Sequence, residues 1–139
     1  LNISKYLMNR EVGFGRKVLQ ILEDFNIRFE HMPTGIDDMS IIIRNRYLTP
    51  DIERLITEKI TETLAPDTLY FEKDLSIIMI VGEEMNEHIG VTARAANALA
   101  TAGINIEMLS QGSSEVSVMF IVKTNQEIAA IRALYAEFF

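Results

Sequence analysis

The sequence predicts an α+β protein made of two similar units, each with an antiparallel β-sheet that carries helices on one face. First, the landmarks Gly13, Asn26-Ile27 and residues 40–43 recur in the second half as Gly90, Asn105-Ile106 and residues 117–120. Second, both halves show the same order of strand-like and helix-like patterns. This spacing places two extra residues in the helical region of the second copy. A self-similar chain with its length differences outside the strands is typical of a duplicated domain.

The first domain is expected to span residues 1–73. Residues 3–8 have a strand pattern, and apolar side chains recur at helical spacing over residues 14–25. Two short strands, 27–32 and 39–43, are joined by turn formers at 33–38. Thr49 and Pro50 predict the start of a second helix, whose buried stripe is expected to be Ile52, Leu55, Ile56, Ile60 and Leu64. A strand at 68–72 completes the unit, and Lys73-Asp74 marks the boundary.

The second domain, residues 74–139, repeats this order with a strand at 75–81 and an alanine-rich helix from about Gly90 to Gly103. Strands at 104–109 and 116–122 flank a turn at 110–114. Thr124 and Glu127 have the spacing of a capping box for a last helix, with an expected apolar stripe of Ile128, Ile131, Leu134, Tyr135 and Phe138. The last strand is missing from the chain order. We expect a strand from residues before Leu1, from the other unit or from a partner chain to cover that sheet edge.

Composition excludes several classes of function. A net charge of −7 with only 13 Lys and Arg residues argues against a nucleic-acid surface. No apolar run reaches the length of a membrane span, so no membrane partner is expected. The absence of cysteine excludes disulfides and fits a cytoplasmic protein. Because the chain begins with Leu almost inside a strand pattern, we expect a fragment of a longer protein.

The residue pattern offers no catalyst. The segment 13–18 lacks the third glycine of a Gly-rich phosphate loop, and no Gly-Lys-Ser/Thr motif occurs. His31 and His88 lie in different units, and no cluster has the spacing of a metal site. We therefore expect no catalytic residue, no metal and no cofactor in this chain.

Several segments carry a resemblance to a known family: Asn-Arg-Glu-Val-Gly-Phe-Gly at 9–15, Val-Gly at 81–82, His-Ile-Gly-Val-Thr-Ala at 88–93, Asn-Ile-Glu-Met at 105–108 and Ser-Gln-Gly-Ser-Ser-Glu-Val-Ser-Val at 110–118. They resemble the C-terminal pair of ACT domains of bacterial aspartate kinases. The resemblance implies two ferredoxin-like (βαββαβ) units. It also implies a regulatory role in an enzyme whose separate kinase domain uses ATP and Mg to phosphorylate aspartate, in lysine, threonine, methionine and diaminopimelate biosynthesis. Residues 10–13 depart from the family's Asp-Lys-Pro-Gly type of turn.

A free amino acid needs donors for its carboxylate and acceptors for its ammonium. The helix entrances after Glu11 and after Ile89 offer backbone N–H groups and the positive end of a helix dipole. Glu30, Asp37 and Asp38 flank the first hairpin and suit a second ammonium, although charges in a turn are often only solvated. With the resemblance, these considerations predict an effector site drawn from Met8, Asn9, Arg10, Glu11, Gly13, Phe14, Glu30, Asp37, Asp38, Gly90, Val91, Thr92, Asn105, Ile106, Ser114 and Glu115.

The carboxylates around the first hairpin favour lysine as the effector, with diaminopimelate or threonine as alternatives. The resemblance implies allosteric feedback inhibition and a homodimer formed through the ACT domains. Two other hypotheses stay open: a ligand-free ACT pair that serves only dimer assembly, and a ferredoxin-like nucleic-acid binder, which the negative charge disfavours.

Overall fold

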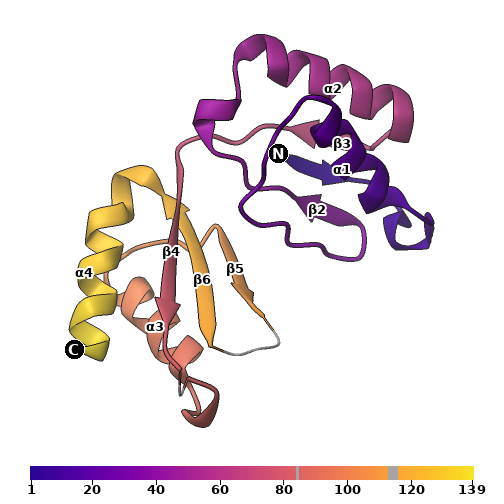
Figure 1. Ribbon diagram of the computed structural model, residues 1–139. Helices are drawn as coiled ribbons and strands as arrows, with labels where there is room; N and C mark the ends of the chain where they lie inside the picture. The colour runs from indigo at the N-terminus through magenta and orange to yellow at the C-terminus, as the bar shows by residue number, and fades with distance from the viewer. Residues whose placement is uncertain (84, 113–115) are drawn as a thin grey trace. The chain divides into compact units, whose positions relative to one another are not determined.

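The computed structural model describes residues 1–83, 85–112 and 116–139. The chain divides into two compact units, Leu1–Glu72 and Lys73–Phe139. Each contains antiparallel strands and two long helices (Figure 1), which confirms the α+β class with ferredoxin-like units.

Unit 1 contains β1 (Asn2–Ser4), α1 (Phe14–Asp24), β2 (Asp38–Ser40), α2 (Pro50–Leu64) and β3 (Thr68–Tyr70), with 3-10 turns at Met8–Arg10 and Asn45–Tyr47. The sheet order is β2-β1-β3, and Ile3 lies opposite both Met39 and Leu69. The Thr49 side chain accepts a hydrogen bond from the Ile52 amide at 3.3 Å, which confirms the predicted cap of α2.

The core of unit 1 forms because α1 and α2 each present one apolar face. The buried residues of these two helices are Phe14, Val18, Ile21, Leu22, Ile56, Ile60 and Leu64, and they pack with Ile3 of β1 and Met39 of β2. Burial of each such side chain contributes about 1.5–3 kcal/mol. The predicted stripe of α2 is wrong at Leu55, which is 38% exposed.

The predicted strand at residues 3–8 ends early. Leu7 has a positive φ of 58°, and the amides of Met8 and Arg10 donate to the carbonyls of Lys5 and Leu7, so the chain turns after Ser4.

The predicted hairpin of strands 27–32 and 39–43 has fewer paired residues than expected. Residues 27–32 form no named strand, and only the bridges His31–Ile42 and Thr34–Met39 flank the short β2. Pro33 lies between these bridges and has no N–H to donate, which accounts for a broken ladder.

Unit 2 contains β4 (Leu75–Val81), α3 (Val91–Thr101), β5 (Met108–Gln111), β6 (Ser117–Lys123) and α4 (Glu127–Phe138), with 3-10 turns at Met85–Glu87 and Thr124–Gln126. The sheet order is β4-β6-β5, and β4 pairs with β6 along its whole length. Ala95 and Ala130 are fully buried in the core with Leu99, Val118 and Phe120. These small residues let α3 and α4 approach the sheet and each other closely.

The strand β4 occupies an edge of its sheet, and within the described residues no strand pairs with its outer side. In unit 1 the equivalent strand β1 has β3 on that side. The edge of β4 therefore stays the place where we expect a strand from outside this unit.

Three expectations for unit 2 are wrong. The predicted strand at 104–109 begins only at Met108, because the Ile104 amide still donates to Leu99 at the helix exit. Thr124 and Glu127 form no capping box: Glu127 Oε2 instead accepts a 2.6 Å hydrogen bond from Ser76 Oγ on β4. The expected stripe of α4 is largely exposed at Ile128, Ile131 and Tyr135, and its buried residues are Ala130 and Leu134. The predicted turn at 110–114 lies partly outside the described residues.

Among the residues that the structure describes, no helix combines the length and apolar character required for a membrane span.

Candidate functional site

The entrance of α1 forms one side of the candidate site. Gly13 is the N-cap residue and has a φ of 79°, a left-handed conformation that favours glycine. Beyond it, the first amides of a helix have no intrahelical acceptor and carry the positive end of the dipole. The sequence predicts that this entrance receives a carboxylate; of its amides, that of Phe14 already donates to the Glu11 carbonyl at 3.2 Å. Val12, just before the glycine, is 95% exposed, and no pattern in the sequence predicted an exposed apolar side chain at this position.

The turn around Asp37 lies against the loop that leads to this entrance. The Asn9 amide donates to the Ile36 carbonyl at 3.1 Å, and the Lys5 amide donates to the Asp37 carbonyl at 2.9 Å. Asp37 Oδ1 is buried and receives no hydrogen bond within the described part of the chain. Leaving a buried carboxylate oxygen without a donor costs free energy, which an ammonium group at this position would offset.

The other two predicted carboxylates have different surroundings. Asp38 is exposed and folds against the turn, so that a Cβ added at Gly35 would stand 2.1 Å from Asp38 Oδ1. Glu30 accepts hydrogen bonds from Arg44 at 2.5 and 3.2 Å, and this guanidinium holds the pKa of Glu30 below its usual range. Glu30 therefore already has a cationic partner, whereas none of the described residues donates to Asp37 Oδ1.

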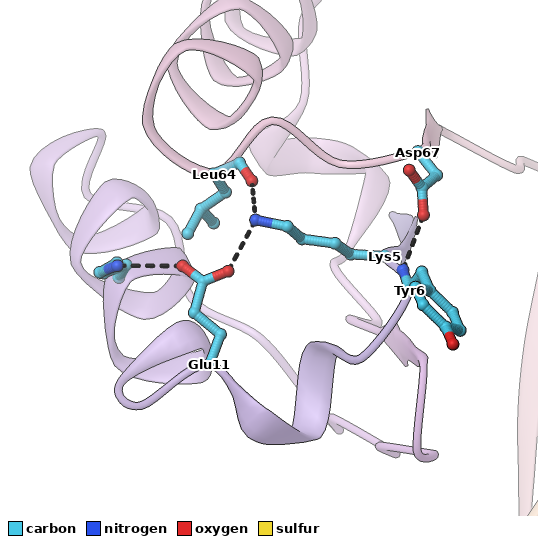
Figure 2. A network of polar contacts seen from close by, with 6 residues as sticks. Lys5, Tyr6, Glu11, Leu64 and Asp67 are labelled. Atoms are coloured by element: carbon cyan, nitrogen blue, oxygen red, sulfur yellow. Dashed lines mark hydrogen bonds and ion pairs between the residues drawn. The ribbon is translucent and has the colours of Figure 1, made fainter.

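Glu11, another predicted site residue, is held by two lysines. Lys5 Nζ lies 2.6 Å from Glu11 Oε2, and Lys17 Nζ lies 3.1 Å from Glu11 Oε1. Hydrogen bonds from Lys5 and then Lys17 lower the pKa of the Glu11 carboxyl. Lys5 also donates to the carbonyl of Leu64 at 2.6 Å (Figure 2). Sequence reasoning missed both lysines, because each lies six positions from Glu11, a separation at which neither a regular helix nor a regular strand brings two side chains into contact.

In unit 2 the predicted residues are divided between the two ends of α3. Gly90, the N-cap, has a φ of 88°, and Thr92 Oγ1 donates to Gln111 Oε1 at 2.9 Å. Asn105 and Ile106 follow the other end of this 11-residue helix, which is about 16 Å long. The structure thus separates Asn105 and Ile106 from Gly90, Val91 and Thr92. Ser114 and Glu115 lie outside the described residues.

A groove of about 820 Å³ lies elsewhere in unit 2, between β4 and α4. Its walls are mainly apolar, with Ile78 and Ile80 on the strand and Ile131, Leu134 and Phe138 on the helix. Val91 is the one predicted effector residue among those that line it. The groove includes residues of β4, whose outer side pairs with no strand within the described residues, and it is lined by His88, Arg94 and Glu127 as well as by apolar side chains. Its mainly apolar walls suit a chain segment better than a zwitterion.

In residues 1–83, 85–112 and 116–139, no group of three His, Cys, Asp or Glu side chains could hold a metal ion.

Comparisons with known proteins agree with this architecture. A family model for the ACT domain matches residues 78–138. The chain is 55% identical over 137 residues to Aspartokinase 3 of Bacillus subtilis, a match that covers 99% of this chain and 30% of that protein.

Two solved structures have the same fold. Aspartate kinase of Clostridium acetobutylicum superposes with a TM-score of 0.93 at 36% identity, covering 99% of this chain and 32% of that one. The ligand-free regulatory subunit of aspartate kinase from Thermus thermophilus gives a TM-score of 0.76 at 24% identity, covering 99% and 90%. The chain therefore spans about a third of the Bacillus and Clostridium proteins and nearly all of the Thermus regulatory subunit. It belongs to the regulatory ACT-domain region of the aspartate kinase family.

Proposed function

We propose that this chain binds a free amino acid, with L-lysine as the first choice, at the entrance of α1 in unit 1, and that binding mediates feedback inhibition of a parent aspartate kinase. The parent reaction would convert ATP and L-aspartate to 4-phospho-L-aspartate in a kinase domain outside this chain. The observation that carries the proposal is the buried Oδ1 of Asp37, which no described residue hydrogen-bonds, beside the loop that leads to Gly13.

The two charged ends of the ligand have matching positions. The carboxylate would accept hydrogen bonds from the first amides of α1, where the dipole favours negative charge. The ammonium would donate to Asp37, and the neighbouring Asp38 would add negative charge at the turn. Met8, Asn9, Arg10, Glu11 and Phe14 belong to the loop and helix start that would surround the ligand.

Lysine fits this arrangement better than threonine because lysine carries a second ammonium group. Diaminopimelate shares this property and is the next candidate. The Clostridium enzyme, 36% identical over this region, is described as an allosteric enzyme, which supports a regulatory rather than a purely structural role.

The equivalent entrance in unit 2 is a weaker candidate. There the hydrogen bond from Thr92 to Gln111 already joins the first turn of α3 to the end of β5. We therefore assign the effector to unit 1 and leave Gly90, Val91 and Thr92 as secondary residues.

Titration calorimetry with lysine, diaminopimelate, threonine and methionine tests the proposal. Asp37→Asn should weaken lysine binding by about ten- to a hundredfold, because a hydrogen bond between charged groups contributes about 1.5–3 kcal/mol. The matched control is Asp38→Asn, which changes the adjacent exposed carboxylate and should have a smaller effect. Unchanged lysine binding in the Asp37→Asn variant would show that the ammonium lies elsewhere.

We further propose that the chain forms a homodimer through its ACT units. The apolar runs at 39–43 and 116–122 do not support a dimer contact, because Met39, Ile41 and Phe120 are buried within their own units. The support is instead the exposure of three large apolar side chains beside the proposed site. Tyr6 and Val12, in the loop before α1, are 75% and 95% exposed, and Ile36, in the turn before Asp37, is 70% exposed. A monomer in sedimentation velocity at micromolar concentration, with and without lysine, would contradict the dimer.

The same experiments separate this function from the alternative of a ligand-free assembly module. A dimer that binds none of the four amino acids would favour assembly alone. We also propose that the chain has no catalytic activity and needs no cofactor, since ATP and Mg would serve the separate kinase domain. Phosphorylation of aspartate by this chain with ATP and Mg²⁺ would contradict that proposal.

A further inference from the structure

The ammonium of Lys5 connects two segments of unit 1 that are distant in sequence. On one side it donates to Glu11, in the loop before α1, and on the other it donates to the carbonyl of Leu64, the last residue of α2 (Figure 2). Both donor–acceptor distances are 2.6 Å. Lys5 and Glu11 expose only 27% and 28% of their side chains, so solvent competes only in part with these contacts.

Charges alternate along this connection. The entrance of α1 is the positive end of its helix dipole, Glu11 is negative, Lys5 is positive, and the carbonyls that end α2 are negative. Each group therefore lies beside one of opposite sign. Lys5 also acts as a side-chain cap for α2, because the last carbonyls of a helix have no intrahelical donor.

A second pair of contacts joins the residues on either side of Lys5 to the segment that follows α2. The Tyr6 amide donates to Asp67 Oδ2 at 2.6 Å, and the Asp67 amide donates to the Ser4 carbonyl at 2.8 Å. Ala65, which lies between Leu64 and Asp67, has a positive φ of 44° and turns the chain from α2 toward β3. Residues 64–67 are thus the point where the chain leaves α2, and they are fixed to residues 4–6 and, through Lys5, to Glu11.

We infer that Lys5 couples the loop before α1 to residues 64–67, so that local opening of either segment is accompanied by opening of the other. The proposed effector would act directly on the loop, and this coupling would carry a change there to the segment that leads into β3. The coupling itself requires no ligand and does not depend on which amino acid binds.

Lys17 provides an internal comparison. It also donates to Glu11, at 3.1 Å, but its described contacts do not include residues 64–67. Removal of Lys17 should therefore loosen the loop without loosening the end of α2, whereas removal of Lys5 should loosen both. A purely local role for the lysines would not produce this difference.

Amide hydrogen exchange of the ligand-free 139-residue chain tests the inference. Lys5→Met keeps the apolar stem and removes the ammonium, and it should speed exchange about tenfold in residues 8–14 and also at the Ala65 and Asp67 amides, since Pro66 between them has no N–H. Glu11→Gln should speed exchange in both segments, although Glu11 makes no described contact with residues 64–67. Lys17→Met should affect residues 8–14 only, and Glu58→Gln, which removes the exposed ion pair with Arg54, should affect neither.

The coupling is overturned if Lys5→Met speeds exchange in one of the two segments alone, or if Lys17→Met and Lys5→Met have the same effect on residues 65–67. Should Lys5→Met fail to fold, Glu11→Gln decides the question. It leaves Lys5 in place, and exchange confined to the loop would then exclude the coupling.

Discussion

Asn26 and Gly103 occupy the same structural position at the ends of α1 and α3. Both have a positive φ, 54° and 70°, and each is followed by an isoleucine whose amide donates at 2.9 Å to a leucine carbonyl in the preceding helix. The repeat therefore aligns Asn26-Ile27 with Gly103-Ile104, not with Asn105-Ile106. The two helices have the same length of 11 residues, so the two extra residues that the sequence placed in the second helical region are not part of that helix.

This equivalence predicts that Gly103→Asn is nearly neutral, because asparagine already adopts the left-handed conformation at the matching position in unit 1. Gly103→Val should destabilise unit 2 by about 1–2 kcal/mol, since a β-branched residue is strained at positive φ. A Cβ at Gly103 would meet no atom within 4 Å, so a steric clash does not contribute at that atom. Urea unfolding of both variants measures the difference, and equal stabilities would contradict the equivalence.

The exposed face of α4 predicts opposite results for two residues of its expected apolar stripe. Leu134→Ala should cost about 2–5 kcal/mol, because Leu134 is 5% exposed and its truncation opens a cavity in the core of unit 2. Ile128→Ala should change stability by less than about 0.5 kcal/mol, because Ile128 is 66% exposed. The same unfolding experiment compares them. A large loss from Ile128→Ala would mean that this face is covered in the protein in solution.

The carboxyls of Glu11 and Glu30 predict a loss of stability in acid. Hydrogen bonds from Lys5 to Glu11 and from Arg44 to Glu30 lower both pKa values from 4.5 in the folded state. As the pH falls below about 4.5, these two carboxyls take up protons in the unfolded state before they do so in the folded state. The stabilisation that they contribute is therefore fully present above that pH and is lost as the pH falls through their folded-state pKa values.

Urea unfolding between pH 7 and about pH 3 measures this effect. A double variant with Glu11→Gln and Glu30→Gln should be less stable than the unmodified chain at pH 7, and it should lose less stability when the pH is lowered. If the unmodified chain and the double variant lost the same free energy of unfolding in acid, these two carboxyls would be excluded as the cause of the loss.

The sequence by itself determined the features that depend on local physics. Helical periodicity identified α1 and α2, because apolar side chains at every third or fourth position must share one face. Thr49 and Pro50 predicted the start of α2, since the capping bond joins residues three apart. Gly13 and Gly90 marked two helix entrances, and the resemblance of the second unit to ACT domains indicated the family.

Strand limits and site contacts were decided only by the tertiary structure. Residues 3–8 read as one strand, but pairing partners exist for β1 only through Ser4, where β2 and β3 meet it. The exposed face of α4 also escaped prediction, because an apolar stripe does not show whether a neighbouring element covers it.

Long-range contacts also decided which of the acidic residues has a carboxylate oxygen available for the ligand's ammonium. Glu30, Asp37 and Asp38 look equivalent in sequence, yet Arg44 pairs with Glu30 and the loop around Asn9 packs on the turn of Asp37. Lys5 reaches both Glu11 and the distant carbonyl of Leu64. Such partners are far apart along the chain, so their distances are fixed by how the helices pack on the sheet and not by any local pattern.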